Sequence, residues 1–255
     1  MNRFLINTVL LERNRWETHR TPSILVSEWL ERFKEDGFDG LELWENHVIK
    51  AQKEEVQLLK KSPFKVDTYN SYVRFEDGYE EERESSANMI RELQVNKVKF
   101  NLGSKPDLEE RYLENLQIWK RDLPAGCRLL CECHPGTIME DPFEVARIYD
   151  ELGSSQFEAI VHPFNEQQDL KRWFDCLGST VTHAHVSLYK SQSFHHLADE
   201  EEFVKKRAAI LRNQKFAGTY SMEFAKGTSC PNENQEVVYN NALQDRHYLQ
   251  NLLRT

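Results

Sequence analysis

Short apolar runs alternate with longer amphipathic segments along the whole 255-residue chain. Val26, Trp29, Leu30 and Phe33 recur at three- and four-residue intervals, which marks the apolar face of a helix. The shorter runs, bounded by Gly, Pro or polar residues, are typical of buried strands. The expected strands are Phe4–Thr8, Gly40–Trp44, Phe64–Tyr69, Lys97–Phe100, Arg128–Cys133, Phe157–Val161, Val181–Ser187 and Gly218–Phe224. The expected helices are Pro22–Asp36, Ala51–Lys61, Tyr79–Leu93, Asp107–Arg121, Asp141–Leu152, Glu166–Leu177, Asp199–Asn213 and Glu233–Leu253.

This order predicts the fold class. Strands that alternate with helices form a parallel sheet, and eight such units in about 250 residues are typical of a (β/α)8 barrel. A doubly wound open sheet is the alternative, but it usually has fewer strands, and no G-x-G-x-x-G follows the first run. We therefore predict an α/β protein, a single TIM barrel domain over residues 1–255.

Composition and charge exclude several classes of partner. The chain is 39% hydrophobic and 29% charged, with a net charge of -9. Binding to nucleic acid or to an anionic membrane needs a basic face, so neither partner is expected. No stretch approaches 18 apolar residues, so no membrane span is expected.

Cysteine usage indicates the compartment. The five cysteines are odd in number, show no C-x-x-C spacing, and follow an N-terminus without the apolar core of a signal peptide. We expect reduced thiols and a cytoplasmic location. Cys131 and Cys133 alternate with Glu132 and should face the opposite side of their strand, in the core.

Polar residues end four successive strands. Glu132 and His134 follow the apolar run from Arg128, and residues two apart in a strand point the same way. Later strands end at His162, at His183 and His185, and at Glu223. In a TIM barrel the carboxyl ends of all strands meet at one face, where active sites lie. The four endings are therefore expected to form one site.

The residue types at this face suit a divalent metal. Imidazole and carboxylate are the usual ligands of such ions, and an unpaired carboxylate at a buried strand end is costly. A set of two Glu and two His fits Mn, Co, Zn or Mg, and these alternatives stay open. Five of the nine histidines fall at strand ends: His47, His134, His162, His183 and His185.

The strand-end motifs resemble a known superfamily. The segments at 37–44 (GFDGLELW), 131–136 (CECHPG), 183–186 (HAHV) and 220–223 (YSME) are similar to those of the xylose isomerase-like TIM barrels. That group includes sugar phosphate isomerases and epimerases, ketose 3-epimerases, hydroxypyruvate isomerase, inosose dehydratase and the AP endonuclease family 2 proteins. The resemblance covers the whole chain and implies that Glu132, His162, His185 and Glu223 hold the metal.

Three positions depart from the pattern of that superfamily. His162 stands where Asp is common, Asn165 where many members have His, and Leu188 where a His-x-x-Asp pattern would place Asp. His162 still offers a ligand atom, but the exchange removes one negative charge from the expected site.

The resemblance also implies a mechanism. Glu132 and Glu223 would serve as an acid/base pair that moves a proton next to a substrate carbonyl polarised by the metal. Expected contacts to a carbohydrate substrate are Trp44, His47, Tyr69, His134, Asn165, His183 and Lys226. Of these, Trp44 and Tyr69, together with Phe164, would pack on the apolar face of a sugar.

Other functions stay open at this point. A dehydratase acting on a keto-inositol would begin with the same proton abstraction, and a catalytically degenerate barrel would bind a sugar without turnover. An AP endonuclease is disfavoured by the net charge of -9. The substrate itself and a homo-oligomeric state are not determined by the sequence.

Overall fold

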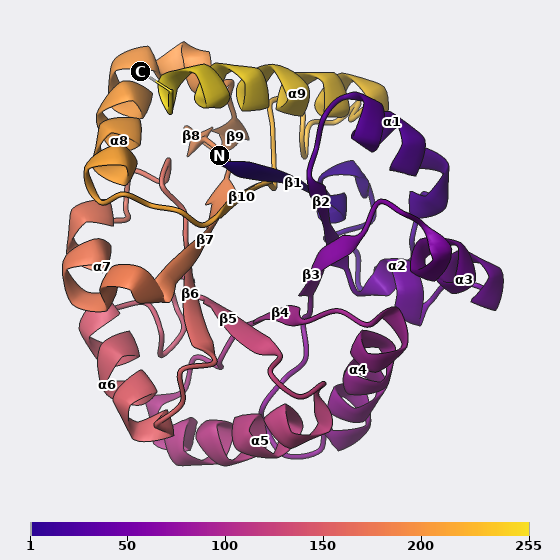
Figure 1. Cartoon of the computed structure of the whole chain (residues 1–255), viewed down its shortest axis with the longest axis vertical. Coiled ribbons are helices and arrows are strands. Elements are labelled where there is room, and N and C mark those ends of the chain that lie inside the picture. The colour runs from indigo at the N-terminus through magenta and orange to yellow at the C-terminus, as the bar shows by residue number, and fades with distance from the viewer. Residues whose placement is uncertain (1, 255) are drawn as a thin grey trace.

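A closed barrel of eight parallel strands forms the centre of the protein (Figure 1). The computed structural model describes residues 2–254. Around the barrel the strands follow the order β1-β10-β7-β6-β5-β4-β3-β2, and helices surround them. The barrel strands are β1 (Arg3–Asn7), β2 (Gly40–Trp44), β3 (Val66–Asn70), β4 (Lys97–Phe100), β5 (Arg128–Glu132), β6 (Phe157–Val161), β7 (Val181–Val186) and β10 (Thr219–Met222). The predicted (β/α)8 TIM barrel is thus confirmed.

The helices follow the strands in the expected alternation. Short 3-10 turns precede or extend several of them: η1 (Thr8–Leu11), η2 (Val26–Trp29), η3 (Pro106–Leu108), η4 (Gly178–Thr180) and η5 (Leu197–Glu200). The α-helices are α1 (Leu30–Glu35), α2 (Asn46–Ile49), α3 (Lys53–Lys61), α4 (Glu80–Leu93), α5 (Glu109–Asp122), α6 (Pro142–Leu152), α7 (Leu170–Leu177), α8 (Glu201–Asn213) and α9 (Gln235–Leu252). None of the helices within residues 2–254 is long and apolar enough to cross a membrane.

The strands are buried on both faces. Every residue of β2 and of β6 is buried, because one face packs on the helices and the other fills the barrel interior. Polar residues share levels inside the barrel: Asn7 pairs in register with Glu42, and Ser221 with His185. The register therefore brings side chains from distant parts of the chain to the same height.

The first helix begins later than the sequence predicts. Pro22 and Thr21 lie in a loop, and the helical segment starts only at Val26. The Ser23 amide donates to Glu12 Oε2 (2.8 Å), and the Ser27 amide to Glu55 Oε1 (2.9 Å). The contact to Glu12 holds Ser23 in the loop, while the contact to Glu55 satisfies an amide in the first turn of the later helix, so these long-range contacts override the local signal of Pro22.

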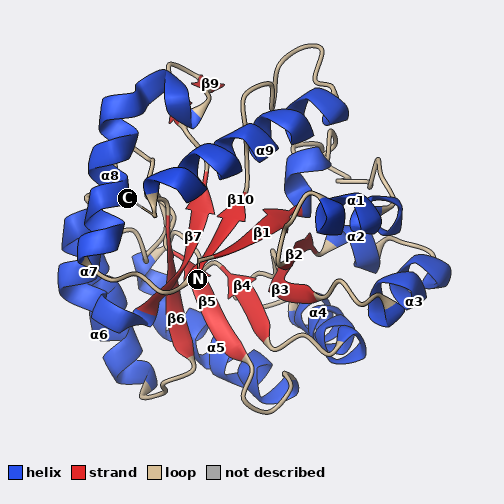
Figure 2. Cartoon of the chain, turned by 45° about the horizontal axis from the view of Figure 1, so that its top comes forward, coloured by secondary structure: helices blue, strands red, loops and turns tan. Residues whose placement is uncertain are grey.

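A small hairpin after β7 was not predicted. Its strands are β8 (Tyr189–Lys190) and β9 (Ser193–Phe194), and Ser191 and Gln192 between them have φ values of 49° and 63°. Two left-handed residues suit a tight hairpin turn. Figure 2 places β9 beyond the arrowheads of β7 and β10, on the carboxyl side of the barrel.

Candidate metal centre and active site

A cavity of about 1000 Å³ opens at the carboxyl ends of the strands. Glu132, His162 and Glu223 line its floor, together with residues of the hairpin and of the loop after β10. Ligand sites of this fold lie at this end of the barrel. The cavity is therefore the candidate active site.

Four of the predicted residues come together beside the cavity. Each offers one ligand atom, and these atoms lie within 4.8 Å of one another; the residues are Glu132, His162, His185 and Glu223. His185 Nδ1 is 3.3 Å from Glu132 Oε1 and 3.2 Å from Glu223 Oε1. His162 Nε2 is 3.3 Å from Glu132 Oε1. Two carboxylates and two imidazoles thus meet at one point.

His162 provides a test of whether this group fits a metal ion. Its Nε2 atom is buried and makes no hydrogen bond, because its direction toward Glu132 is poor despite the short distance. Buried ring nitrogens usually have a partner. A buried nitrogen beside the Glu132 carboxylate and without a hydrogen-bond partner fits a metal ligand, and the mixed N and O donor set suits divalent ions.

Glu42 holds two histidines from below. Its Oε1 is 2.9 Å from His185 Nε2, and its Oε2 is 2.9 Å from His183 Nε2. Burial alone would raise the pKa of Glu42, but the two histidines lower it well below its ordinary value. Burial likewise lowers the pKa of His185, yet Glu42 and Glu223 raise it well above the ordinary value. Glu42 therefore fixes the His185 ring with Nδ1 facing the two site carboxylates.

Lys99 supplies a fixed positive charge beside Glu132. Its ammonium is 1% exposed and lies 2.9 Å from Glu132 Oε2. Burial would raise the pKa of Glu132, but Lys99 and the two histidines hold it well below its ordinary value. Asn101 Nδ2 donates to the same oxygen at 3.2 Å. One oxygen of Glu132 is thus held by Lys99 and Asn101, while the other faces the histidines.

Tyr72 is a further group at the cavity that sequence reasoning missed. Its ring lies 4.0 Å from the Lys99 ammonium, and it lines the cavity. Burial raises the pKa of Tyr72 to about 12, so its phenol is neutral at physiological pH. Glu42 and Lys99 were also missed; Glu42 is the one charged residue of an otherwise apolar strand, which was an available signal, whereas Lys99 shares its strand with Lys97.

The predicted substrate contacts divide into two groups. His134, Asn165 and Lys226 line the cavity. Trp44, His47, Tyr69 and His183 are buried and do not, so the structure does not place them where a substrate could touch them. Phe164 is likewise fully buried.

Specific contacts keep these residues away from the cavity. His47 lies between Thr8 Oγ1 (2.9 Å) and Glu12 Oε2 (3.1 Å), and Trp44 packs edge-on against its ring. His183 is bound to Glu42 and to Thr219, one level below His185. A strand-end residue reaches the cavity only if it belongs to the uppermost layer, and the sequence does not mark that layer.

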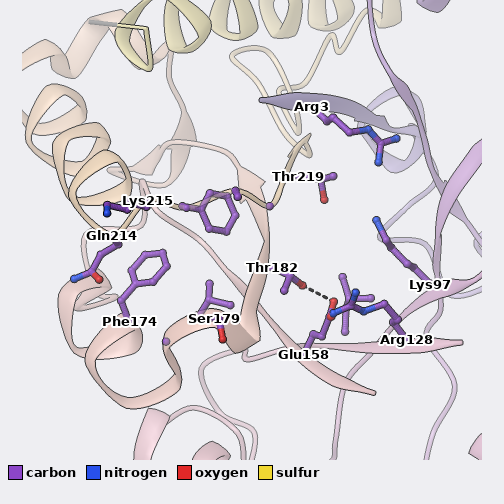
Figure 3. Close-up of a pocket in the computed structure, with 16 residues that line it drawn as sticks. Arg3, Lys97, Arg128, Glu158, Phe174, Ser179, Thr182, Gln214, Lys215 and Thr219 are labelled. Carbon is purple, nitrogen blue, oxygen red and sulfur yellow. Dashed lines mark hydrogen bonds and ion pairs between the residues drawn. The ribbon is translucent and has the colours of Figure 1, made fainter. Parts of the chain in front are cut away.

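A second cavity lies at the opposite, amino-terminal end of the barrel. It measures about 480 Å³, and Figure 3 shows Arg3, Lys97 and Arg128 around it, with Glu158 beside Arg128. Three of its cations are paired: Arg3 and Lys97 with Asp67, and Arg128 with Glu158. Polar residues at this end of a TIM barrel generally serve stability.

Comparisons with known proteins agree with this fold. The chain superposes on D-psicose 3-epimerase from Clostridium cellulolyticum H10 with a TM-score of 0.71 at 12% identity, covering 98% of this chain and 99% of the other. The probable 3-DHS dehydratase AsbF from Bacillus anthracis gives 0.70 at 14% identity, with 98% and 99% covered. A xylose isomerase-like TIM barrel protein from Mycobacterium smegmatis, in complex with magnesium, gives 0.65 at 8% identity, with 99% and 97% covered.

These likenesses define the class of fold. No family model matches the sequence, and no curated protein matches it. At such low identities the solved structures establish the fold alone. The chain has the fold of the xylose isomerase-like TIM barrels, as the strand-end motifs predicted.

Proposed function

We propose that this protein is a divalent-metal-dependent isomerase or epimerase acting on a sugar, a sugar phosphate or a keto-polyol. One observation carries the proposal: the carboxylates of Glu132 and Glu223 converge on His185 Nδ1, at 3.3 and 3.2 Å, on the floor of a cavity. Proton transfer next to a carbonyl needs two such groups held close together.

The four converging residues would hold the metal. Glu132, His162, His185 and Glu223 would each contribute one atom, with Nδ1 as the free nitrogen of His185. A bound divalent ion would polarise the substrate carbonyl and so acidify the neighbouring C–H bond. The donor set leaves Mn, Co, Zn and Mg as candidates.

Side chains of the site would transfer the proton and bind the substrate. One of the two glutamates would remove the proton from the carbon next to the carbonyl, and the other would handle the proton on the opposite face. Lys99 and Asn101 keep Glu132 ionised and oriented through its second oxygen. His134, Asn165 and Lys226, which line the cavity, would bind substrate hydroxyls.

The structural neighbours support a carbohydrate substrate at the level of the fold. One is an epimerase of a ketohexose, and its fold matches over nearly the whole chain. A net charge of -9 disfavours a nucleic-acid substrate. We therefore propose that the substrate is a small-molecule carbohydrate and that the protein acts in the cytoplasm.

Metal analysis together with an activity screen tests the proposal. The purified protein should contain about one divalent ion per chain and should interconvert at least one ketose pair. The reaction is monitored by the incorporation of solvent deuterium at the reacting carbon. Glu132→Gln and Glu223→Gln should each lower the rate by at least about 100-fold. Glu140→Gln, on the loop after β5, is the control and should leave both the metal content and the rate unchanged. Retained metal and activity in both site variants would refute the assignment.

Dehydration is the second candidate. It shares the proton abstraction but then expels hydroxide from the next carbon, and the dehydratase among the neighbours supports it. Products distinguish the two, because a dehydratase yields an unsaturated compound and an epimerase does not. Absence of metal and of turnover would instead favour a barrel that only binds sugar.

A further inference from the structure

Four aromatic side chains form a continuous wall on one side of the cavity. Trp16, Phe224, Phe194 and Tyr189 follow one another, with ring centroids 5.8, 5.0 and 5.0 Å apart. All four line the cavity. We call this set the aromatic wall. Phe224, the second ring of the series, directly follows Glu223 in the chain and so connects the wall to the proposed acid/base pair.

The two ends of the aromatic wall are exposed, and Phe194 and Phe224 between them are half-buried. Trp16 is 63% exposed and Tyr189 is 54% exposed, whereas Trp44 and Trp119 are fully buried. Large apolar side chains that gather at a surface commonly mark a binding site. Three separate loops contribute to the wall: the loop after η1, the β8–β9 hairpin and the loop after β10.

Buried ionic contacts hold the aromatic wall in place. Arg15 NH1 and NH2 bind the two oxygens of Glu233 at 2.9 and 2.5 Å, and Arg15 also donates to the carbonyls of Val9 and Leu10. The neighbouring Trp16 donates from Nε1 to Ser229 Oγ (3.0 Å). Two of the wall's loops are thus tied together before any ligand arrives, and such preorganisation lowers the entropy cost of binding.

Polar groups complete the cavity around the wall. His134, Asn165, His195 and Lys226 line it and supply hydrogen-bond donors and acceptors. An aromatic face together with polar groups is the environment that a sugar ring needs, because its C–H face is apolar and its edge carries hydroxyls. This combination favours a carbohydrate over a purely apolar ligand.

The extent of the wall indicates the size of the substrate. One sugar ring stacks on about one aromatic ring, yet four rings follow in series. The cavity volume of about 1000 Å³ lies at the upper end of the range for drug-sized ligands. Building on the function proposed above, we propose that the aromatic wall is a second sugar subsite and that the substrate is a reducing disaccharide, whose reducing unit carries the carbonyl in its open form and lies at Glu132 and Glu223.

Calorimetric binding to the metal-loaded full chain tests this inference. The probes are hexose disaccharides, their methyl glycosides, their component monosaccharides and the matching p-nitrophenyl glycosides. At least one disaccharide should bind about tenfold more tightly than either of its monosaccharides. Trp16→Ala and Phe194→Ala should each abolish that preference and change monosaccharide affinity less than about twofold. Trp16→Phe should keep most of it, and Phe143→Ala, an exposed residue of α6, all of it.

The outcomes separate the two proposals. Equal affinity for disaccharides and monosaccharides, no sugar binding at all, or a preference that survives both alanine variants would overturn the subsite. A preference for p-nitrophenyl glycosides alone would also overturn it, in favour of an aromatic aglycone. Metal content and turnover in Glu132→Gln do not depend on the wall. If Glu132→Gln changed neither the metal content nor the turnover, the proposed function would be overturned. A disaccharide preference that is lost in Trp16→Ala would still support the subsite.

Discussion

Glu42 and His185 form a buried ion pair, with 2.9 Å between Glu42 Oε1 and His185 Nε2, directly below the point where the two site carboxylates meet. Both side chains are fully buried. The pair leaves only Nδ1 of His185 free to face Glu132 and Glu223. The orientation of one proposed ligand therefore depends on a residue of β2, on the far side of the barrel.

Glu42→Gln should weaken metal binding without removing a ligand. Glutamine keeps the shape but loses the charge that orients the His185 ring, and such outer partners commonly contribute about 10–100-fold to metal affinity. Competition with a chelator measures the effect. Glu12→Gln is the matched control, because Glu12 pairs with the buried His47 outside the site and should leave the affinity unchanged. Equal losses in both variants would contradict the role of Glu42.

Lys99→Met should destabilise the metal-free protein more than the metal-loaded protein. The substitution leaves the Glu132 carboxylate without its buried cation, and breaking a buried pair typically costs about 3–5 kcal/mol. A divalent ion at Glu132 would restore part of the missing positive charge. Urea unfolding with and without metal measures both states. The same loss in the two states would mean that Glu132 does not bind the ion.

His162→Asp should tighten the binding of divalent ions. The added carboxylate raises the negative charge of the ligand set, and the gain should be at least about tenfold. Calorimetric titration with manganese or magnesium checks it. His134→Asp places the same charge on an exposed residue that lines the cavity, and it should change affinity far less. Similar gains in both variants would mean that the added negative charge acts through the electrostatic field of the cavity and not by direct coordination of the ion.

Glu45 should make the protein less stable as the pH rises. Burial raises the pKa of Glu45 to about 7 from its ordinary value of 4.5. The folded state then holds more protons than the unfolded state between about pH 4.5 and pH 7, so stability falls across this window by about 3 kcal/mol. Glu45→Gln should remove this fall, as measured by urea unfolding at pH 4.5 and pH 8. Glu54→Gln, exposed on α3, should keep it.

Periodicity was enough to predict the barrel because it is a local property. A strand buried on both faces, such as Gly40–Trp44, must be an apolar run, and an amphipathic helix must repeat its stripe. The convergence of Glu132, His162, His185 and Glu223 also followed from sequence, since parallel strands in a closed barrel present all their carboxyl ends to one face. The predicted start of the first helix was wrong because Glu12, distant in sequence, binds the Ser23 amide in the loop, and Glu55 binds the Ser27 amide where the helical segment does begin.

The sequence by itself determined which strands end in titratable side chains, because residue type and strand order are written in it. Only the tertiary structure decided the layer at which each side chain lies. That layer separates His185, which contacts the two site carboxylates, from His183 one level below, and it puts Glu42 and Lys99 in contact with the site. It also buries Trp44 and Tyr69, whereas Trp16, Phe194 and Phe224 line the cavity. Strand register and loop packing join residues more than 100 positions apart, and no local pattern encodes such contacts.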